Sequence, residues 1–156
     1  MTNTWILVAD AARARLFEPA PNDGRLLEID CFTNPDGRAG ARRTGIRRRR
    51  AANDGTDAFR QLIEPHPTAR DKVADRFAHT LSDALERGRS RRRYERLVLV
   101  APPRFLGALR EHLGQPVRDS VAGELRRDFT ELRPAELRER LPRRLLPRTR
   151  ATMPRG

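Results

Sequence analysis

Arginines and glycines crowd residues 32–67 of this chain, in a pattern suited to binding phosphate groups. Arginine forms paired hydrogen bonds to phosphate oxygens, and glycine lets a backbone approach its ligand closely. The arginines are Arg38, Arg42, Arg43, Arg47, Arg48, Arg49 and Arg50, and the glycines are Gly37, Gly40 and Gly45. Because apolar periodicity is sparse there, we expect a long loop that is mobile without its partner and binds RNA. A solvated insertion without a ligand is the alternative.

Several aspartates invite comparison with nucleases that use carboxylates to hold two metal ions. Asp10 follows an apolar run, and Asp71, Asp75 and Asp83 fall in a later helical pattern. The apolar run that ends before Pro102 carries no acid, so these residues do not complete a two-metal site. We expect Asp10 to be a turn residue that caps local N–H groups. The sequence therefore predicts no catalytic residue and no metal site.

Histidines offer no second route to catalysis. Asp75, His79 and Asp83 are four residues apart and share a helix face, where they could bind a metal weakly or form solvated charge pairs. We favour the charge pairs. His66 and His112 have no serine, cysteine or acid at catalytic spacing, and the chain has neither a phosphate-binding loop nor a metal-binding cysteine set. We expect a protein that is not an enzyme and needs no cofactor.

Arg104 is a separate candidate for anion binding. Pro102 and Pro103 follow an apolar run and open a helix, so Arg104 falls at a helix N-terminus, where free N–H groups attract anions. Ligands favour the carboxyl ends of strands in open sheets, and Asp10 would lie nearby if the two apolar runs form neighbouring strands. Alternatively, the prolines only set the turn and Phe105 anchors the core.

The charge balance agrees with a polyanionic partner. The 156 residues include 33 Lys+Arg and 21 Asp+Glu, which gives a formal net charge of +12. Lys72 is the only lysine, so a compositional bias toward arginine is a competing explanation. Cys31 stands alone, which rules out an internal disulfide and suits a reducing compartment.

The N-terminal residues do not resemble an export signal. Met1 to Thr4 contain no Lys or Arg, and the apolar run from Trp5 to Ala9 ends at Asp10. No stretch approaches the ~18 apolar residues of a membrane span. We therefore expect a cytoplasmic protein without membrane insertion.

Hydrophobic patterning predicts three strands followed by a crossover. Strands are expected at Thr4–Ala9, Arg13–Glu18 and Leu26–Phe32, with a hairpin signal at Asp23-Gly24. They should form an antiparallel meander. A further buried strand, Leu97–Ala101, should lie beside the first and parallel to it, because a helix intervenes.

The remaining elements complete an α/β fold. A helix should begin near Thr68 and stop at Gly88, with an apolar stripe of Val73, Ala74, Phe77, Ala78, Leu81 and Leu85. A helix opening at Pro103 should turn Phe105, Leu106, Leu109 and Leu113 inward, and it should be followed by a short helix at Val117–Val121, a strand at Leu125–Thr130 and a helix at Pro134–Leu141. This order predicts one ribonuclease H-like domain, residues 1–142, with a mixed sheet and flanking helices. Residues 143–156 should form an Arg/Pro-rich disordered tail.

Two strings carry a family resemblance: TWILVADAARARLF from Thr4 and RLVLVAPPRFLGALR from Arg96. Together they resemble the bacterial host attachment protein family, whose members are similar to the middle domain of archaeal and eukaryotic release factors. The resemblance implies the ribonuclease H-like fold. In release factors, the loop after the third strand carries a Gly-Gly-Gln tip that promotes peptide release. This chain has Asp36 to Arg42 there without a glutamine, Gln61 lies far along, and Gly114-Gln115 follows a later helix.

These observations lead to one functional hypothesis and one alternative. We expect a non-enzymatic, RNA- or ribosome-associated factor on a release-factor-like scaffold. The RNA contacts would be the loop arginines and Arg104. The alternative is a protein-interaction or regulatory domain with an indirect role in attachment to host cells.

Overall fold

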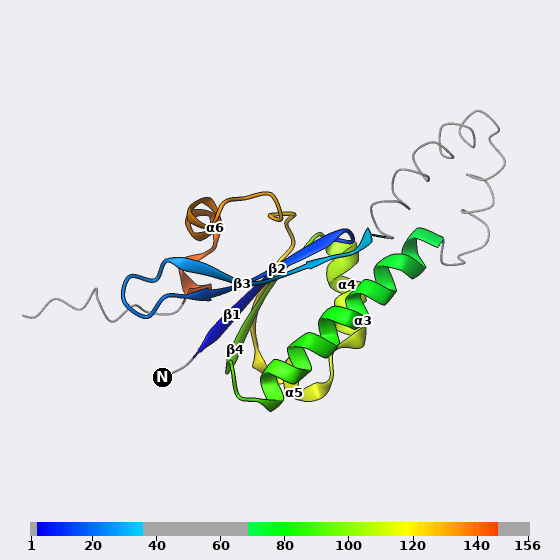
Figure 1. Ribbon diagram of the computed structural model, residues 1–156, viewed down its shortest axis with the longest axis horizontal. Helices are drawn as coiled ribbons and strands as arrows, with labels where there is room; N and C mark the ends of the chain where they lie inside the picture. The colour runs from blue at the N-terminus through cyan, green and yellow to red at the C-terminus, as the bar shows by residue number, and fades with distance from the viewer. Residues whose placement is uncertain (1–2, 36–68, 147–156) are drawn as a thin grey trace, which may run out of the picture.

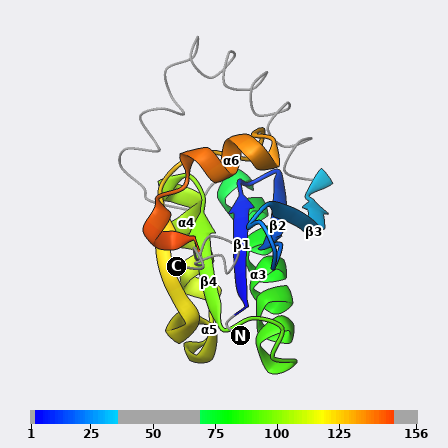
Figure 2. The same cartoon turned by 90° about the vertical axis from the view of Figure 1, so that its left-hand side faces the viewer.

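Five strands of this α/β protein form a single mixed sheet, seen in a computed structural model that describes residues 3–35 and 69–146. The strands are β1 (Thr4–Ala9), β2 (Arg13–Pro19), β3 (Leu26–Thr33), β4 (Arg96–Val100) and β5 (Val121–Leu125). Their order across the sheet is β3-β2-β1-β4-β5. Figure 2 shows β1 between β2 and β4.

The directions of the strands confirm the predicted meander and crossover. β1 runs antiparallel to β2, with Ile6 opposite Phe17, and β2 runs antiparallel to β3. β4 lies on the other side of β1 and parallel to it, with Ile6 opposite Val98. β5 then extends the sheet parallel to β4. The helical crossover accounts for the parallel pairing, because a short turn can join only antiparallel neighbours.

Helices cover both faces of the sheet (Figure 1). One face packs against α3 (Ala69–Ser90), α4 (Pro103–His112) and α5 (Gln115–Ser120), and the other against α6 (Pro134–Arg140) and the 3₁₀ turn η1 (Arg143–Leu145). All six residues of β1 are buried because their side chains alternate between these two layers. No helix in residues 3–35 or 69–146 is both long and apolar enough to cross a membrane.

The apolar stripe of α3 packs as predicted, but the helix does not stop at Gly88. Phe77 and Leu81 are buried against the sheet, and the helix continues to Ser90. Gly88 is buried beside Trp5, where a side chain would collide with the indole ring. The helix ends instead in a Schellman-type turn, in which Arg92 adopts φ 56° and the Arg93 N–H donates to the Gly88 carbonyl. The glycine thus serves tertiary packing and not helix termination.

Replacing Gly88 with alanine should destabilise the protein, although alanine is the better helix former. The new Cβ would lie 2.5 Å from two ring carbons of Trp5, and overpacking of this kind costs about 1–3 kcal/mol. Gly107→Ala in α4 is the matched control, since a Cβ there meets nothing within 4 Å. It should raise the free energy of unfolding by about 1 kcal/mol. Urea unfolding of both variants provides the test, and equal stabilisation of the two would contradict this packing.

The C-terminal third differs from the prediction in three places. The strand predicted at Leu125–Thr130 is wrong: β5 ends at Leu125, and residues 126–133 form a loop. Pairing with β4 draws Val121 to Leu125 into the sheet, so the predicted short helix ends at Ser120. Leu145, which fell in the predicted tail, is buried against Gly123. Residues 147–156 lie outside the described part of the chain.

Candidate functional site

The ends of β1, β4 and β5 meet at one edge of the sheet, because the three strands are parallel. We call this the carboxyl edge. It comprises the β1–β2 turn at residues 10–12, the β4–α4 connection at residues 101–102 with the first turn of α4, and the loop at residues 126–133. Open sheets most often bind ligands at such an edge. Both Asp10 and Arg104 lie on it.

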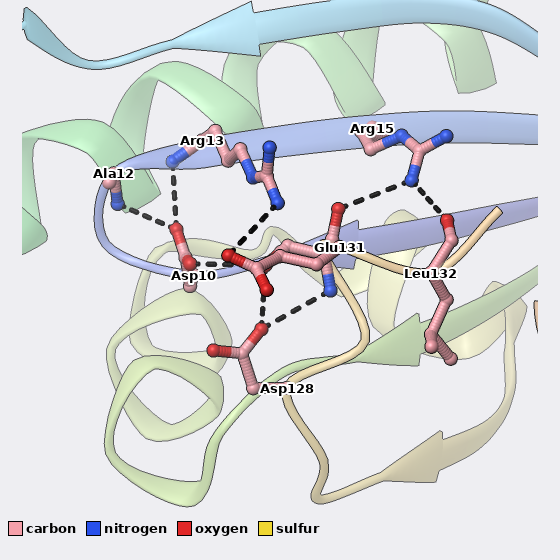
Figure 3. A network of polar contacts seen from close by, with 8 residues as sticks. Asp10, Ala12, Arg13, Arg15, Asp128, Glu131 and Leu132 are labelled. Atoms are coloured by element: carbon pink, nitrogen blue, oxygen red, sulfur yellow. Dashed lines mark hydrogen bonds and ion pairs between the residues drawn. The ribbon is translucent and has the colours of Figure 1, made fainter.

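Asp10 holds the β1–β2 turn together, as expected from the sequence (Figure 3). Its Oδ1 accepts hydrogen bonds of 2.8 Å from the backbone N–H groups of both Ala12 and Arg13. Its Oδ2 lies 3.2 Å from the hydroxyl of Thr130, which is buried and lies 2.7 Å from Asp128 Oδ1. Asp10 is therefore engaged through both oxygens, in contacts that order the edge.

Two arginines of β2 tie the 126–133 loop to the sheet (Figure 3). Arg15 Nη1 donates to the carbonyl oxygens of Leu132 at 2.5 Å and Thr130 at 3.2 Å, while its Nε donates to Glu28 at 2.8 Å. Arg13 lies 3.9 Å from the Glu131 carboxylate. The sequence analysis missed these roles. In a strand of alternating polar and apolar residues, the sequence does not indicate which distant carbonyl group an arginine will contact.

Arg104 lies in the first turn of α4, as predicted, and its side chain is 83% exposed. Its guanidinium pairs with the Asp71 carboxylate at 3.7 Å, at the start of α3. β1 and β4 are neighbours, as that prediction required, so Asp10 lies at the same edge, where it bonds to its own turn and to Thr130. Arg104 therefore lies on the protein surface at the carboxyl edge, beside the beginning of α3.

The predicted loop residues lie outside the described part of the chain, so their positions stay predictions. They are Gly37, Arg38, Gly40, Arg42, Arg43, Gly45, Arg47, Arg48, Arg49 and Arg50. The described residues that flank them are both at the carboxyl edge. Asn34 follows β3, and its Nδ2 donates to the Ala11 carbonyl at 3.0 Å and the Val73 carbonyl at 3.5 Å. Since α3 begins at Ala69, the basic segment leaves and returns at this edge.

Further exposed arginines come from three elements that meet there. They are Arg70 at the start of α3, Arg104 in α4, and Arg126, Arg127 and Arg133 in the loop after β5. Acidic side chains are interspersed with them, notably Asp71, Asp128 and Glu131. The edge is therefore rich in guanidinium groups but not uniformly positive.

Asp75, His79 and Asp83 of α3 take part in two separate pairs, one of which includes a histidine of α4. His79 and Asp83 form the predicted exposed i,i+4 pair at 3.6 Å. Asp75 instead binds His112 Nε2 of α4 at 2.8 Å, which links the two helices. No three His, Cys, Asp or Glu residues within 3–35 and 69–146 are arranged to hold a metal ion.

The Gly114-Gln115 pair lies at the opposite end of the sheet, which we call the amino edge because β1 and β4 begin there. Gly114 precedes α5, and the Gln115 side chain donates to Asp119 at 2.8 Å. The pair is therefore remote from the loop that follows β3.

Residues 5–141 match the model of a family described as "Protein required for attachment to host cells". No curated protein matches the chain. The matched region takes in every element of the sheet and the whole carboxyl edge.

Proposed function

The chain belongs to the host attachment protein family, and we propose that it is a non-enzymatic factor that binds RNA or the ribosome in the cytoplasm. The scaffold is release-factor-like and ribonuclease H-like, a proposal supported by the three-strand meander followed by parallel strands. The missing Gly-Gly-Gln tip supports binding without peptide release.

The observation that carries the proposal is the convergence of arginines on the carboxyl edge. Exposed guanidinium groups from α3, α4 and the 126–133 loop lie at the edge where the Arg/Gly-rich segment leaves and returns. Guanidinium groups bind phosphates in a bidentate manner and lose little hydration on doing so. A phosphate backbone laid across this edge could contact groups from several elements at once, and the formal net charge of +12 would attract it.

The engaged state of Asp10 supports a binding role over a hydrolytic one. A nuclease of this fold class uses carboxylates to hold its metal ions, and Asp10 at the end of β1 was the candidate at this edge. Here both oxygens of Asp10 accept hydrogen bonds that hold the turn and Thr130. Its position serves the architecture of the edge.

Two measurements test the proposal. Sedimentation with ribosomal fractions at graded salt should show association that disappears as salt rises. Anisotropy of a labelled single-stranded RNA should give a linear fall of log affinity with log salt, with a slope of about −0.7 per phosphate neutralised. Replacing Arg47, Arg48, Arg49 and Arg50 with glutamine should flatten that slope by about 2–3 units and leave the fold intact.

Two double variants test whether the RNA contacts lie at the carboxyl edge or at the amino edge. Arg126→Gln with Arg127→Gln should flatten the slope by about 1.4 units, because two phosphate contacts are lost. Arg87→Gln with Arg91→Gln is the matched control, since both are exposed arginines near the amino edge. The proposal fails if all three sets of substitutions leave the slope unchanged. If only the control flattens the slope, the RNA contacts belong to the amino edge.

If the protein binds no RNA at any salt, the alternative of a protein-interaction or regulatory domain gains support. In that case the excess of arginine reflects composition. The sedimentation experiment would then show no ribosome association even at low salt.

A further inference from the structure

A hollow of about 250 Å³ lies beside β3, toward the amino edge and on the α3 side of the sheet. Asn3 and Trp5 of the first strand region, Leu16 and Glu18 of β2, and Ile29 and Asp30 of β3 line it, together with Arg93 from the turn after α3. It is separate from the carboxyl edge. Neither the polar contacts of Asp10 nor the exposed arginines of the loop take part in it.

The lining has the chemistry of a cation site with an apolar wall. Leu16, Ile29 and the indole of Trp5 supply apolar surface, while Glu18 and Asp30 bring two carboxylates. The Glu18 carboxylate has no hydrogen-bond or ion-pair partner among the described residues. Among the described residues, Asp30 accepts only the N–H of Cys31. Arg93 forms no ion pair with either carboxylate in the described structure.

The strand beside the hollow has one open edge. In the described sheet β3 pairs only with β2, so its outer N–H and C=O groups have no strand partner. Its side chains are mostly exposed, and Leu27 and Ile29, at 48% and 42%, are the exposed large hydrophobic residues of the described chain. An open strand edge with exposed apolar side chains is suited to accept an added strand.

We propose that β3 and the adjoining hollow bind an extended, arginine-bearing peptide of a partner protein. The peptide backbone adds a strand to the open edge of β3, and apolar side chains cover Leu27 and Ile29. An arginine of the peptide enters the hollow, where its guanidinium pairs with Glu18 and Asp30 and its methylene groups lie against Trp5 and Leu16. The carboxylates therefore select a cationic side chain at one position of the peptide.

Charge argues against a second copy of this chain as the added strand. β3 has an irregular register at Ile29, with Glu28 and Asp30 on either side of it, so self-pairing of two copies would bring these carboxylates together at the new edge. Like charges close together on paired strands destabilise the pair. A basic strand has the opposite effect, because it places positive charge against the same acidic residues.

Fluorescence of the protein's single tryptophan gives a direct readout, because Trp5 lines the hollow. The probe is a capped peptide of alternating threonine and valine with a central arginine, and the matched peptide carries citrulline there. Citrulline keeps the shape of the side chain but lacks its charge. The arginine peptide should produce a saturable change in Trp5 emission, and the citrulline peptide should bind at least about tenfold more weakly.

Variants of the protein test whether the peptide arginine binds at the hollow. Glu18→Gln and Asp30→Asn should each weaken binding of the arginine peptide by about tenfold, since each removes a charged hydrogen-bond acceptor. Asp23→Asn is the control: it removes one acidic charge from the β2–β3 hairpin, outside the hollow, where Asp23 pairs with Arg25 at 3.1 Å. It should leave the affinity unchanged.

Three outcomes overturn the proposal. The first is equal binding, or no binding, of the arginine and citrulline peptides. The second is equal loss of affinity in the Asp23→Asn control and the two hollow variants. The third is concentration-dependent dimerisation in sedimentation that Asp30→Asn strengthens, which would identify a second copy as the occupant of β3. None of these results bears on RNA binding at the carboxyl edge.

Discussion

Truncation of Phe77 to alanine should lower the free energy of unfolding by about 3–5 kcal/mol. The ring is 5% exposed and lies in the layer between α3 and the sheet, with its centroid 6.0 Å from that of Phe105. Removing it deletes a large apolar group and leaves a cavity between α3 and α4. The backbone hydrogen bonds of two helices and the sheet prevent the surrounding atoms from closing that cavity.

Urea unfolding followed by circular dichroism measures this loss. Arg76→Ala is the control, because Arg76 precedes Phe77 in the same helix and is exposed. Its substitution should change the free energy of unfolding by less than about 0.5 kcal/mol. Equal stability of the Phe77→Ala variant and the parent would show that α3 presents a different face to the sheet.

Alkaline pH should destabilise the protein through Tyr94. Burial raises the pKa of Tyr94 to about 12, with the nearby Glu86 acting in the same direction and Arg89 opposing it. The ordinary tyrosine pKa is about 10, so the folded state holds the phenolic proton more tightly than the unfolded state. The resulting stability is fully present below about pH 10 and is lost as the pH rises toward 12. The loss should reach about 3 kcal/mol.

The composition of the chain allows this pH-dependent loss of stability to be assigned to Tyr94. Tyr94 is the only tyrosine, Cys31 the only cysteine and Lys72 the only lysine, and arginine stays charged over this range. Cys31 and Lys72 are exposed, whereas Tyr94 is buried and donates to the Leu85 carbonyl at 2.7 Å. The free energy of unfolding should therefore be measured by urea titration at about pH 9 and about pH 12.

The Tyr94→Phe variant distinguishes the loss of stability caused by ionisation of the phenol from losses that alkaline pH causes elsewhere in the protein. The variant should lose about 1 kcal/mol at pH 9, because the hydrogen bond to Leu85 is absent. Above pH 10 its stability should fall much less than that of the parent. If the two proteins lose stability in parallel, a group other than Tyr94 controls the alkaline transition.

Local patterns were sufficient to predict the architecture around β1. The five-residue run from Trp5 to Ala9, which is apolar at every position, predicts a strand covered on both faces, and the structure places β1 in the middle of the sheet. The helical stripe predicted the burial of Phe77 and Leu81, and the crossover predicted the parallel pairing of β1 and β4. In each case the physical cause acts within a few residues or depends on the length of a connection, so it can be read along the chain.

Contacts between residues that are far apart in the sequence could be identified only from the tertiary structure. Gly88 resembles a helix stop, but its role comes from Trp5, and β5 begins earlier than predicted because β4 offers a pairing edge. The same holds for Arg15, whose partners Thr130 and Leu132 are more than a hundred residues away. The hollow beside β3 likewise combines residues from the first three strands and the turn after α3. Such contacts depend on which surfaces face each other after folding, and spacing along the chain does not encode that relationship.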